Sequence, residues 1–174
     1  RILDFAYISR GDLDVAFASR DLARAAVCFN LVSIAIEGVA AVSLAATLLP
    51  LSSASAASAF TPEQLSALAM LSIRSHSLGF GIALIFFGVE CVILGLLIYR
   101  SGYMPRPIGV LMQIAGLCYL VNSFAVLLSP PLSSLLFPAI LMPALLAELS
   151  LALWLFVKGV RTEKWERRIQ AARS

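Results

Sequence analysis

Residues 78–99 read LGFGIALIFFGVECVILGLLIY, an apolar run interrupted by one charged side chain, Glu90. A helix needs about 20 mostly apolar residues to cross the hydrocarbon core of a bilayer. Three more runs of this kind occur, so the sequence predicts transmembrane helices at about residues 25–49, 78–99, 108–128 and 138–157. Only 13% of the 174 residues are charged, whereas a soluble domain carries about 25%. The predicted fold class is an all-α integral membrane helical bundle with four transmembrane helices.

The basic residues predict how this bundle is oriented. Twelve of the thirteen Lys and Arg residues fall on one side of the predicted membrane, and only Arg74 falls on the other. Because cytoplasmic loops are enriched in Lys and Arg, we expect both the N- and the C-terminus to be cytoplasmic. The predicted organisation is a cytoplasmic segment at residues 1–24, a four-span domain at 25–160 and a basic cytoplasmic tail at 161–174. The sequence contains no basic stripe interleaved with aromatic residues, so it does not indicate nucleic-acid binding.

A helix is predicted to begin well before the second span. Residues 61–64 read TPEQ, which supplies an N-cap threonine, a proline at the first helical position and a capping-box glutamine. An unbroken helix from there to Tyr99 would be about 57 Å long, nearly twice the thickness of the hydrocarbon core. Two glycines weaken residues 77–81, so we expect a break there and an interfacial helix over residues 63–76.

Three glutamates, Glu37, Glu90 and Glu148, lie near the middles of three predicted spans. An ionised side chain at the bilayer centre costs roughly 2.5–3.5 kcal/mol on insertion scales, so each should face the bundle interior or a water-filled cavity. Asn30 lies about 20° from the helical face of Glu37, and Asn122 adds an amide to the third span. We expect these five residues to form the ligand-binding site, with Glu37 and Glu148 at its centre.

Three functional interpretations of the glutamates remain open. They could bind a proton, cation or small ligand in a transport or sensing component, which is the leading interpretation. They could instead be protonated and join helices at about 0.6 kcal/mol per contact, in a structural or partner-binding subunit. The third alternative is an intramembrane metal-dependent enzyme that uses His76, the lone histidine at the outer edge.

The motifs of common enzymes do not support the third alternative. The sequence has neither HExxH nor GxSxG, so we predict no catalytic residue, metal site or cofactor. The three cysteines, Cys28, Cys91 and Cys118, are far apart within apolar runs and are expected to be structural. The expected partner is the lipid bilayer, and a homo-oligomer or a membrane partner remains open.

Residues 86–119, FFGVECVILGLLIYRSGYMPRPIGVLMQIAGLCY, and residues 141–160, LMPALLAELSLALWLFVKGV, carry a family resemblance. The chain resembles domain-of-unknown-function family 4386, small polytopic membrane proteins known mainly from bacterial genomes. The resemblance implies a multi-pass protein of the bacterial inner membrane and a six-helix bundle of which this chain would be the last four. The family often has histidine or tyrosine in place of Glu90, so Glu37 and Glu148 fit its pattern better. It implies no catalytic residue, substrate or cofactor.

Overall fold

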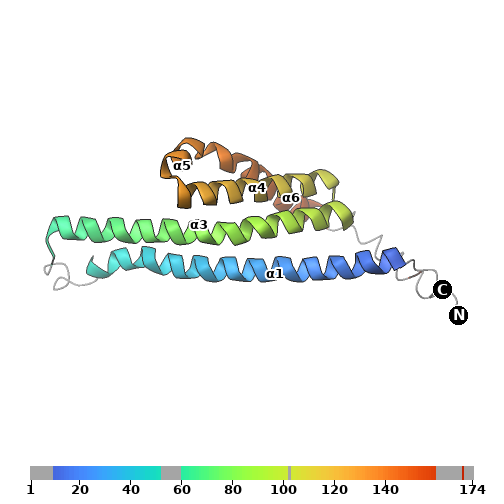
Figure 1. The fold of residues 1–174 in the computed structure, drawn as a ribbon, viewed down its shortest axis with the longest axis horizontal. Coiled ribbons are helices and arrows are strands. Elements are labelled where there is room, and N and C mark those ends of the chain that lie inside the picture. Colours follow the sequence, from blue (N-terminus) through green and yellow to red (C-terminus); the bar gives the residue numbers. More distant parts are fainter. Residues whose placement is uncertain (1–9, 52–59, 102, 160–169, 171–174) are drawn as a thin grey trace.

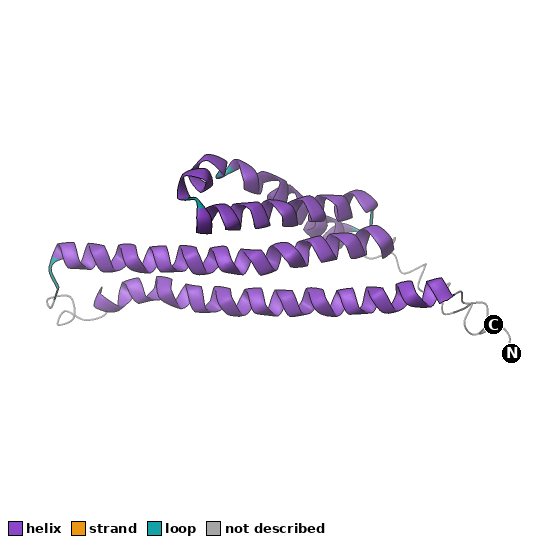
Figure 2. Cartoon of the chain, in the orientation of Figure 1, coloured by secondary structure: helices purple, strands orange, loops and turns teal. Residues whose placement is uncertain are grey.

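The computed structural model describes residues 10–51, 60–101, 103–159 and 170, and this part of the chain is helical without any strand (Figure 2). The elements in chain order are α1 (Arg10–Ala45), η2 (Ala46–Leu51), α3 (Pro62–Ser101), α4 (Arg106–Leu128), α5 (Pro130–Leu136), η3 (Ala139–Leu141) and α6 (Met142–Val157).

Four helical stretches are long and apolar enough to cross a membrane, and each overlaps one of the four predicted spans. They are Ser19–Leu48, Pro62–Ser101, Arg106–Leu128 and Ala139–Val157. The prediction of an all-α integral membrane bundle is therefore confirmed.

Helices α1, α3 and α4 lie side by side in that order, and α6 lies against α4 (Figure 1). Helix α1 packs along one side of α3, and α4 packs along the other. Helix α6 packs mainly on α4, after the chain has turned back through α5 and η3. Among the described residues, α1 and α6 are not close neighbours.

Glycines bring the backbones of α3 and α4 into contact. A Cβ added at Gly95 would lie 2.5 Å from the carbonyl oxygen of Gly109, and one at Gly116 would lie 2.5 Å from that of Gly88. Within each helix the two glycines are seven residues apart, so they fall on one stripe. The pairing of 88 with 116 and of 95 with 109 fixes an antiparallel register, and the small residues allow the helices to approach closely.

The predicted break near residues 77–81 is wrong, because α3 continues without interruption from Pro62 to Ser101. Its glycines serve packing instead. A Cβ at Gly79 would lie 2.7 Å from the Cβ of Ala40 on α1. Because α1 lies along α3 at this point, the neighbouring helix supports the segment that the glycine would otherwise weaken.

The predicted start of this helix is confirmed. The backbone N–H of Thr61 donates to Oε1 of Gln64 at 2.9 Å, and the N–H of Gln64 donates to Oγ1 of Thr61 at 3.3 Å. This reciprocal pair is a capping box. The predicted interfacial helix over residues 63–76 is consequently the first part of α3 itself, which is about 60 Å long.

The packed core lies between α3, α4 and α6. Its buried members are Cys91, Ile98, Ile108, Met112, Ala115, Ala144 and Ala147, with partly buried side chains such as Trp154 packed against them. Trp154, near the end of α6, packs against this core.

Basic side chains surround this end of the bundle. Arg106 lies over the ring of Tyr99 at 5.7 Å, and Lys158 lies over that of Trp154 at 5.1 Å. Aromatic rings with nearby cations are typical of a membrane interface. The cytoplasmic identity of this side stays a prediction, and residues 1–9 and most of the basic tail lie outside the described residues.

Candidate functional site

The depth of each polar group in the membrane can be worked out from α4, because the length of this helix is close to the thickness of the hydrocarbon core. Its 23 residues span about 34 Å, against a hydrocarbon core of about 30 Å. The middle of the core therefore lies near Leu117. Since Gly116 faces Gly88, the same level on α3 is near Phe87. Residues on all helices can be placed from there at 1.5 Å per residue.

Glu90 joins α3 to α1 about 5 Å from the membrane middle. Nδ2 of Asn30 donates to its Oε2 at 2.7 Å, and both side chains are partly buried. Beside this pair, the rings of Phe29 and Phe86 pack with centroids 6.1 Å apart. The predicted proximity of Asn30 to an intramembrane glutamate is therefore present, but the glutamate is Glu90 rather than Glu37.

Glu148 joins α6 to α4 about 3 Å from the membrane middle. The hydroxyl of Tyr119 donates to its Oε1 at 2.6 Å. The Tyr119 ring also meets Phe87 edge-on, with centroids 5.3 Å apart, so this residue links three helices.

Glu37 differs from the other two glutamates. It is exposed on α1, and its side chain makes no hydrogen bond or ion pair with any residue in the described ranges. Because α1 and α6 are not close neighbours among the described residues, the structure does not bring Glu37 and Glu148 to one site. Helical periodicity predicts which residues share a face within one helix. The separation of Glu37 from Glu148 depends on how different helices pack together, which periodicity does not predict.

Asn122 and Ser123 are buried polar residues on α4. Asn122 is 6% exposed and Ser123 is 0% exposed. Neither side chain makes a hydrogen bond within the part of the chain that the structure describes. Asn122 lies one turn from Tyr119.

Sequence reasoning missed Tyr119. Its position offered a usable signal, because a phenol in the middle of an apolar run needs a hydrogen-bond partner when it is buried. The reasoning also missed Ser123, for which no such signal was evident.

Among the described residues, no group of three or more His, Cys, Asp or Glu side chains could hold a metal ion. His76 lies about 16 Å from the membrane middle, so it is at the edge of the hydrocarbon core. Its Nδ1 lies 3.1 Å from the carbonyl oxygen of Ala40, and its ring stacks on Phe80 at 6.0 Å. These contacts tie α3 to α1.

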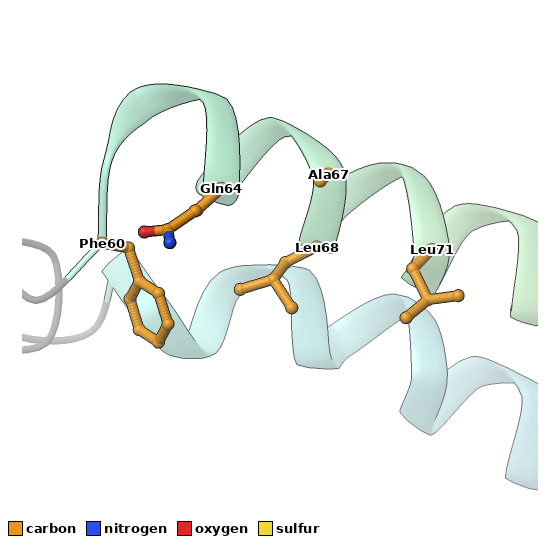
Figure 3. A pocket seen from close by; sticks show the side chains of 5 residues that line it. All are labelled: Phe60, Gln64, Ala67, Leu68 and Leu71. Carbon is orange, nitrogen blue, oxygen red and sulfur yellow. The ribbon is translucent and has the colours of Figure 1, made fainter.

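A shallow groove of about 310 Å³ lies where α3 begins, beside the end of α1 (Figure 3). It is lined by Phe60, Gln64, Ala67, Leu68 and Leu71, and its wall is mostly apolar. At 1.5 Å per residue the groove lies more than about 20 Å from the membrane middle, and it contains none of the intramembrane carboxyl groups.

Four apolar helices with internal polar pairs define a polytopic integral membrane protein. Domain of unknown function (DUF4386) matches residues 15–159, and the chain belongs to this family. An uncharacterised protein of Archaeoglobus fulgidus is 47% identical over 38 residues, which cover 22% of this chain and 24% of that protein. The match thus spans about a quarter of that relative. No solved structure matches the chain.

Proposed function

We propose that this protein is a partner-binding membrane subunit, and that the surface around Glu37 is where the partner binds. We call this surface the α1 outer face and define it by Ile34, Glu37, Gly38, Ala41 and Ala45, which are all exposed. The observation that carries the proposal is the contrast among three intramembrane glutamates. Glu90 and Glu148 each accept a hydrogen bond from a neighbouring helix, and Glu37 has no such donor in the described residues.

Glu37 lies within the hydrocarbon core. It is seven residues, about 10.5 Å, from Asn30 towards the opposite side of the membrane, which places it about 6 Å from the middle. Side chains on a helix lean towards the N-terminus. For Glu37 that direction leads back towards the membrane middle, so the carboxyl group leans away from the nearer surface. A polar group without a hydrogen bond in an apolar medium costs roughly 2–7 kcal/mol, and a protein partner would remove this cost.

The two partnered glutamates support the structural part of this proposal. Each forms one short hydrogen bond to a different helix, at 2.7 Å and 2.6 Å. Together they connect α1 to α3 and α4 to α6. In this role Glu90 and Glu148 hold the bundle together through these hydrogen bonds.

One observation favours a second candidate function, the binding of a proton or small cation at Glu148. Only Oε1 of Glu148 is engaged by Tyr119, and the Asn122 amide is buried one turn away without a hydrogen bond in the described ranges. A carboxylate, a phenol and an amide carbonyl are oxygen ligands suited to such an ion. Under this candidate, Glu148→Gln abolishes cation-dependent stabilisation of the purified protein, and an unchanged dependence rejects it.

The placement in the membrane is part of the proposal. We propose a multi-pass protein of a bacterial inner membrane, with the Arg106 and Lys158 end in the cytoplasm, because cytoplasmic ends are enriched in basic residues. A cysteine at Arg106 should then resist an impermeant thiol reagent added to intact cells, and a cysteine at Ser134 should react. The opposite pattern would reverse the orientation.

Photo-crosslinking in the membranes of the producing cells tests the partner surface. A photoreactive residue in place of Ala41 should give a protein adduct, and the Glu37→Leu change should reduce it. The same residue in place of Leu149, which is 50% exposed on α6, is the matched control and should give lipid adducts alone. Lipid adducts alone at both positions would reject the proposed function.

A further inference from the structure

We propose that one end of the bundle binds the headgroup of an anionic phospholipid through Arg106 and Lys158. We call this place the headgroup site and define it by these two basic residues together with Tyr99 and Trp154. It is formed by α3, α4 and the end of α6. No residue of the α1 outer face takes part in it, so the site is independent of the proposed protein partner.

The two basic side chains lie at the edge of the hydrocarbon core, on the same side of the membrane. Arg106 begins α4, half the length of that helix and thus about 17 Å from the membrane middle. Lys158 follows α6 and lies about 12 Å from the middle, and its long side chain can reach further towards the surface. Because half of the hydrocarbon core is about 15 Å thick, both cations lie at the level of the phospholipid headgroups.

Aromatic rings hold both cations in place. The guanidinium carbon of Arg106 lies 5.7 Å from the ring centroid of Tyr99, and Nζ of Lys158 lies 5.1 Å from that of Trp154. Both rings border the same core, since Tyr99 follows its buried member Ile98 and Trp154 packs against it. A ring face attracts a cation but has no acceptor oxygen. The N–H groups of both cations are therefore left to donate to another group.

The register of α6 along α4 brings the two cations near each other. The hydrogen bond between Tyr119 and Glu148 fixes this register. In it Lys158 is level with Gly109, about 5 Å along the helix axis from Arg106. Packed helices lie about 8–10 Å apart, a distance that two long basic side chains and one headgroup between them can bridge.

Neither cation is neutralised within the described part of the chain. Arg106 and Lys158 are exposed and form no hydrogen bond or ion pair with any described residue. The first turn of α4 contains no acidic residue. On α1, Asp21 lies at a similar depth but is paired with Arg24 at 3.1 Å. Charge complementarity therefore favours an anion that comes from outside the described chain.

The anion that fits is the phosphodiester of a lipid with net negative charge. Headgroups occupy this level around any protein that crosses the membrane, so the ligand is already present where the cations lie. A guanidinium can donate two parallel hydrogen bonds to phosphate oxygens, and an ammonium adds a compact charge. Phosphatidylglycerol keeps its negative charge, whereas the choline cation of phosphatidylcholine opposes the two basic side chains.

Native mass spectrometry of the purified full chain in mild detergent tests the site. Phosphatidylglycerol or phosphatidylcholine is titrated, and the affinity for the first lipid molecule is measured. Wild type should bind phosphatidylglycerol about tenfold or more tightly than phosphatidylcholine. Arg106→Gln and Lys158→Gln should each weaken the binding of phosphatidylglycerol about fivefold. Tyr99→Leu keeps every charge but removes a ring, and it should weaken binding about two- to fivefold.

Arg74→Gln is the matched control. Arg74 is an exposed arginine on α3, and it lies about 20 Å from the membrane middle on the opposite side. Its replacement changes the net charge by the same amount and should leave the affinity within about twofold of wild type. All four replaced side chains are exposed, and thermal unfolding in lipid-free detergent shows whether each variant remains folded.

Three results would overturn the headgroup site. Equal affinities for the two lipids would show that the negative charge of the lipid is not recognised. An equal loss in Arg74→Gln and Arg106→Gln would show that net charge alone attracts the lipid. Displacement of phosphatidylglycerol by millimolar inorganic phosphate would identify a site for a soluble anion instead of a lipid.

Discussion

Replacing Gly95 by alanine should force α3 and α4 apart at their closest contact. The new Cβ would lie 2.5 Å from the carbonyl oxygen of Gly109 and 2.8 Å from both the backbone nitrogen and Cγ of Gln113. Ordinary van der Waals contact begins at about 3.4 Å. Two of the three obstructing atoms belong to the backbone and cannot rotate away. The helices must therefore separate locally by up to about 0.9 Å, the difference between these distances.

The expected loss follows from two opposing effects. Overpacking of a well-packed contact typically costs about 1–3 kcal/mol, and the rigid backbone at Gly95 favours the upper part of this range. Alanine also favours the helix over glycine by about 1 kcal/mol. We expect Gly95→Ala to lower the free energy of unfolding by about 1–2 kcal/mol. Gly38→Ala gains the helical preference without a clash, and it should be neutral or stabilising by up to about 1 kcal/mol.

Reversible unfolding in mixtures of mild detergent and SDS measures both variants against wild type. The difference in the free energy of unfolding between the two variants is the informative quantity, since the same substitution is made in two helices of the same bundle. An equal effect of Gly95→Ala and Gly38→Ala would refute the close contact between α3 and α4.

Further predictions concern the hydrogen bond of α6 and the start of α3. Tyr119→Phe should lower the free energy of unfolding by about 0.6 kcal/mol and by no more than about 1.7 kcal/mol. A double-mutant cycle with Glu148→Leu should give a coupling energy of that size, and a coupling of zero would rule out the bond. Thr61→Ala removes the N-cap and should cost about 0.5–2 kcal/mol of helix stability. Hydrogen exchange should then be faster in the first turn of α3 and unchanged in α4, whereas equal acceleration in both helices would argue against a local cap.

The helices and their limits were largely readable from the sequence. The third span was expected at residues 108–128 and α4 runs from Arg106 to Leu128, because a run of apolar residues ending at a proline is a local signal. The capping box of Thr61 and Gln64 was likewise local. The break at residues 77–81 was predicted from the same kind of signal and is wrong, because Gly79 packs against α1 and its effect depends on that tertiary contact.

The contacts between residues on different helices were harder to predict from the sequence. The spacing of seven residues between Gly88 and Gly95 could have indicated a close helix contact, but it does not identify the neighbouring helix. The sequence identified Glu37, Glu90 and Glu148 as alike, since all three lie at similar depth. Their difference arises from the order of the helices, which leaves Glu37 on an outer helix without a donor in the described residues.

The effect of each glutamate on the stability of the monomer tests the central claim most directly. The free energy of unfolding is measured for the purified protein in dilute detergent for Glu37→Leu, Glu90→Leu and Glu148→Leu. Loss of an intramembrane hydrogen bond should cost Glu90→Leu and Glu148→Leu about 0.6–1.7 kcal/mol each. Glu37→Leu should stay within about 0.5 kcal/mol of wild type. A loss for Glu37→Leu as large as for the other two would contradict the account, because Glu37 would then have a partner within its own chain.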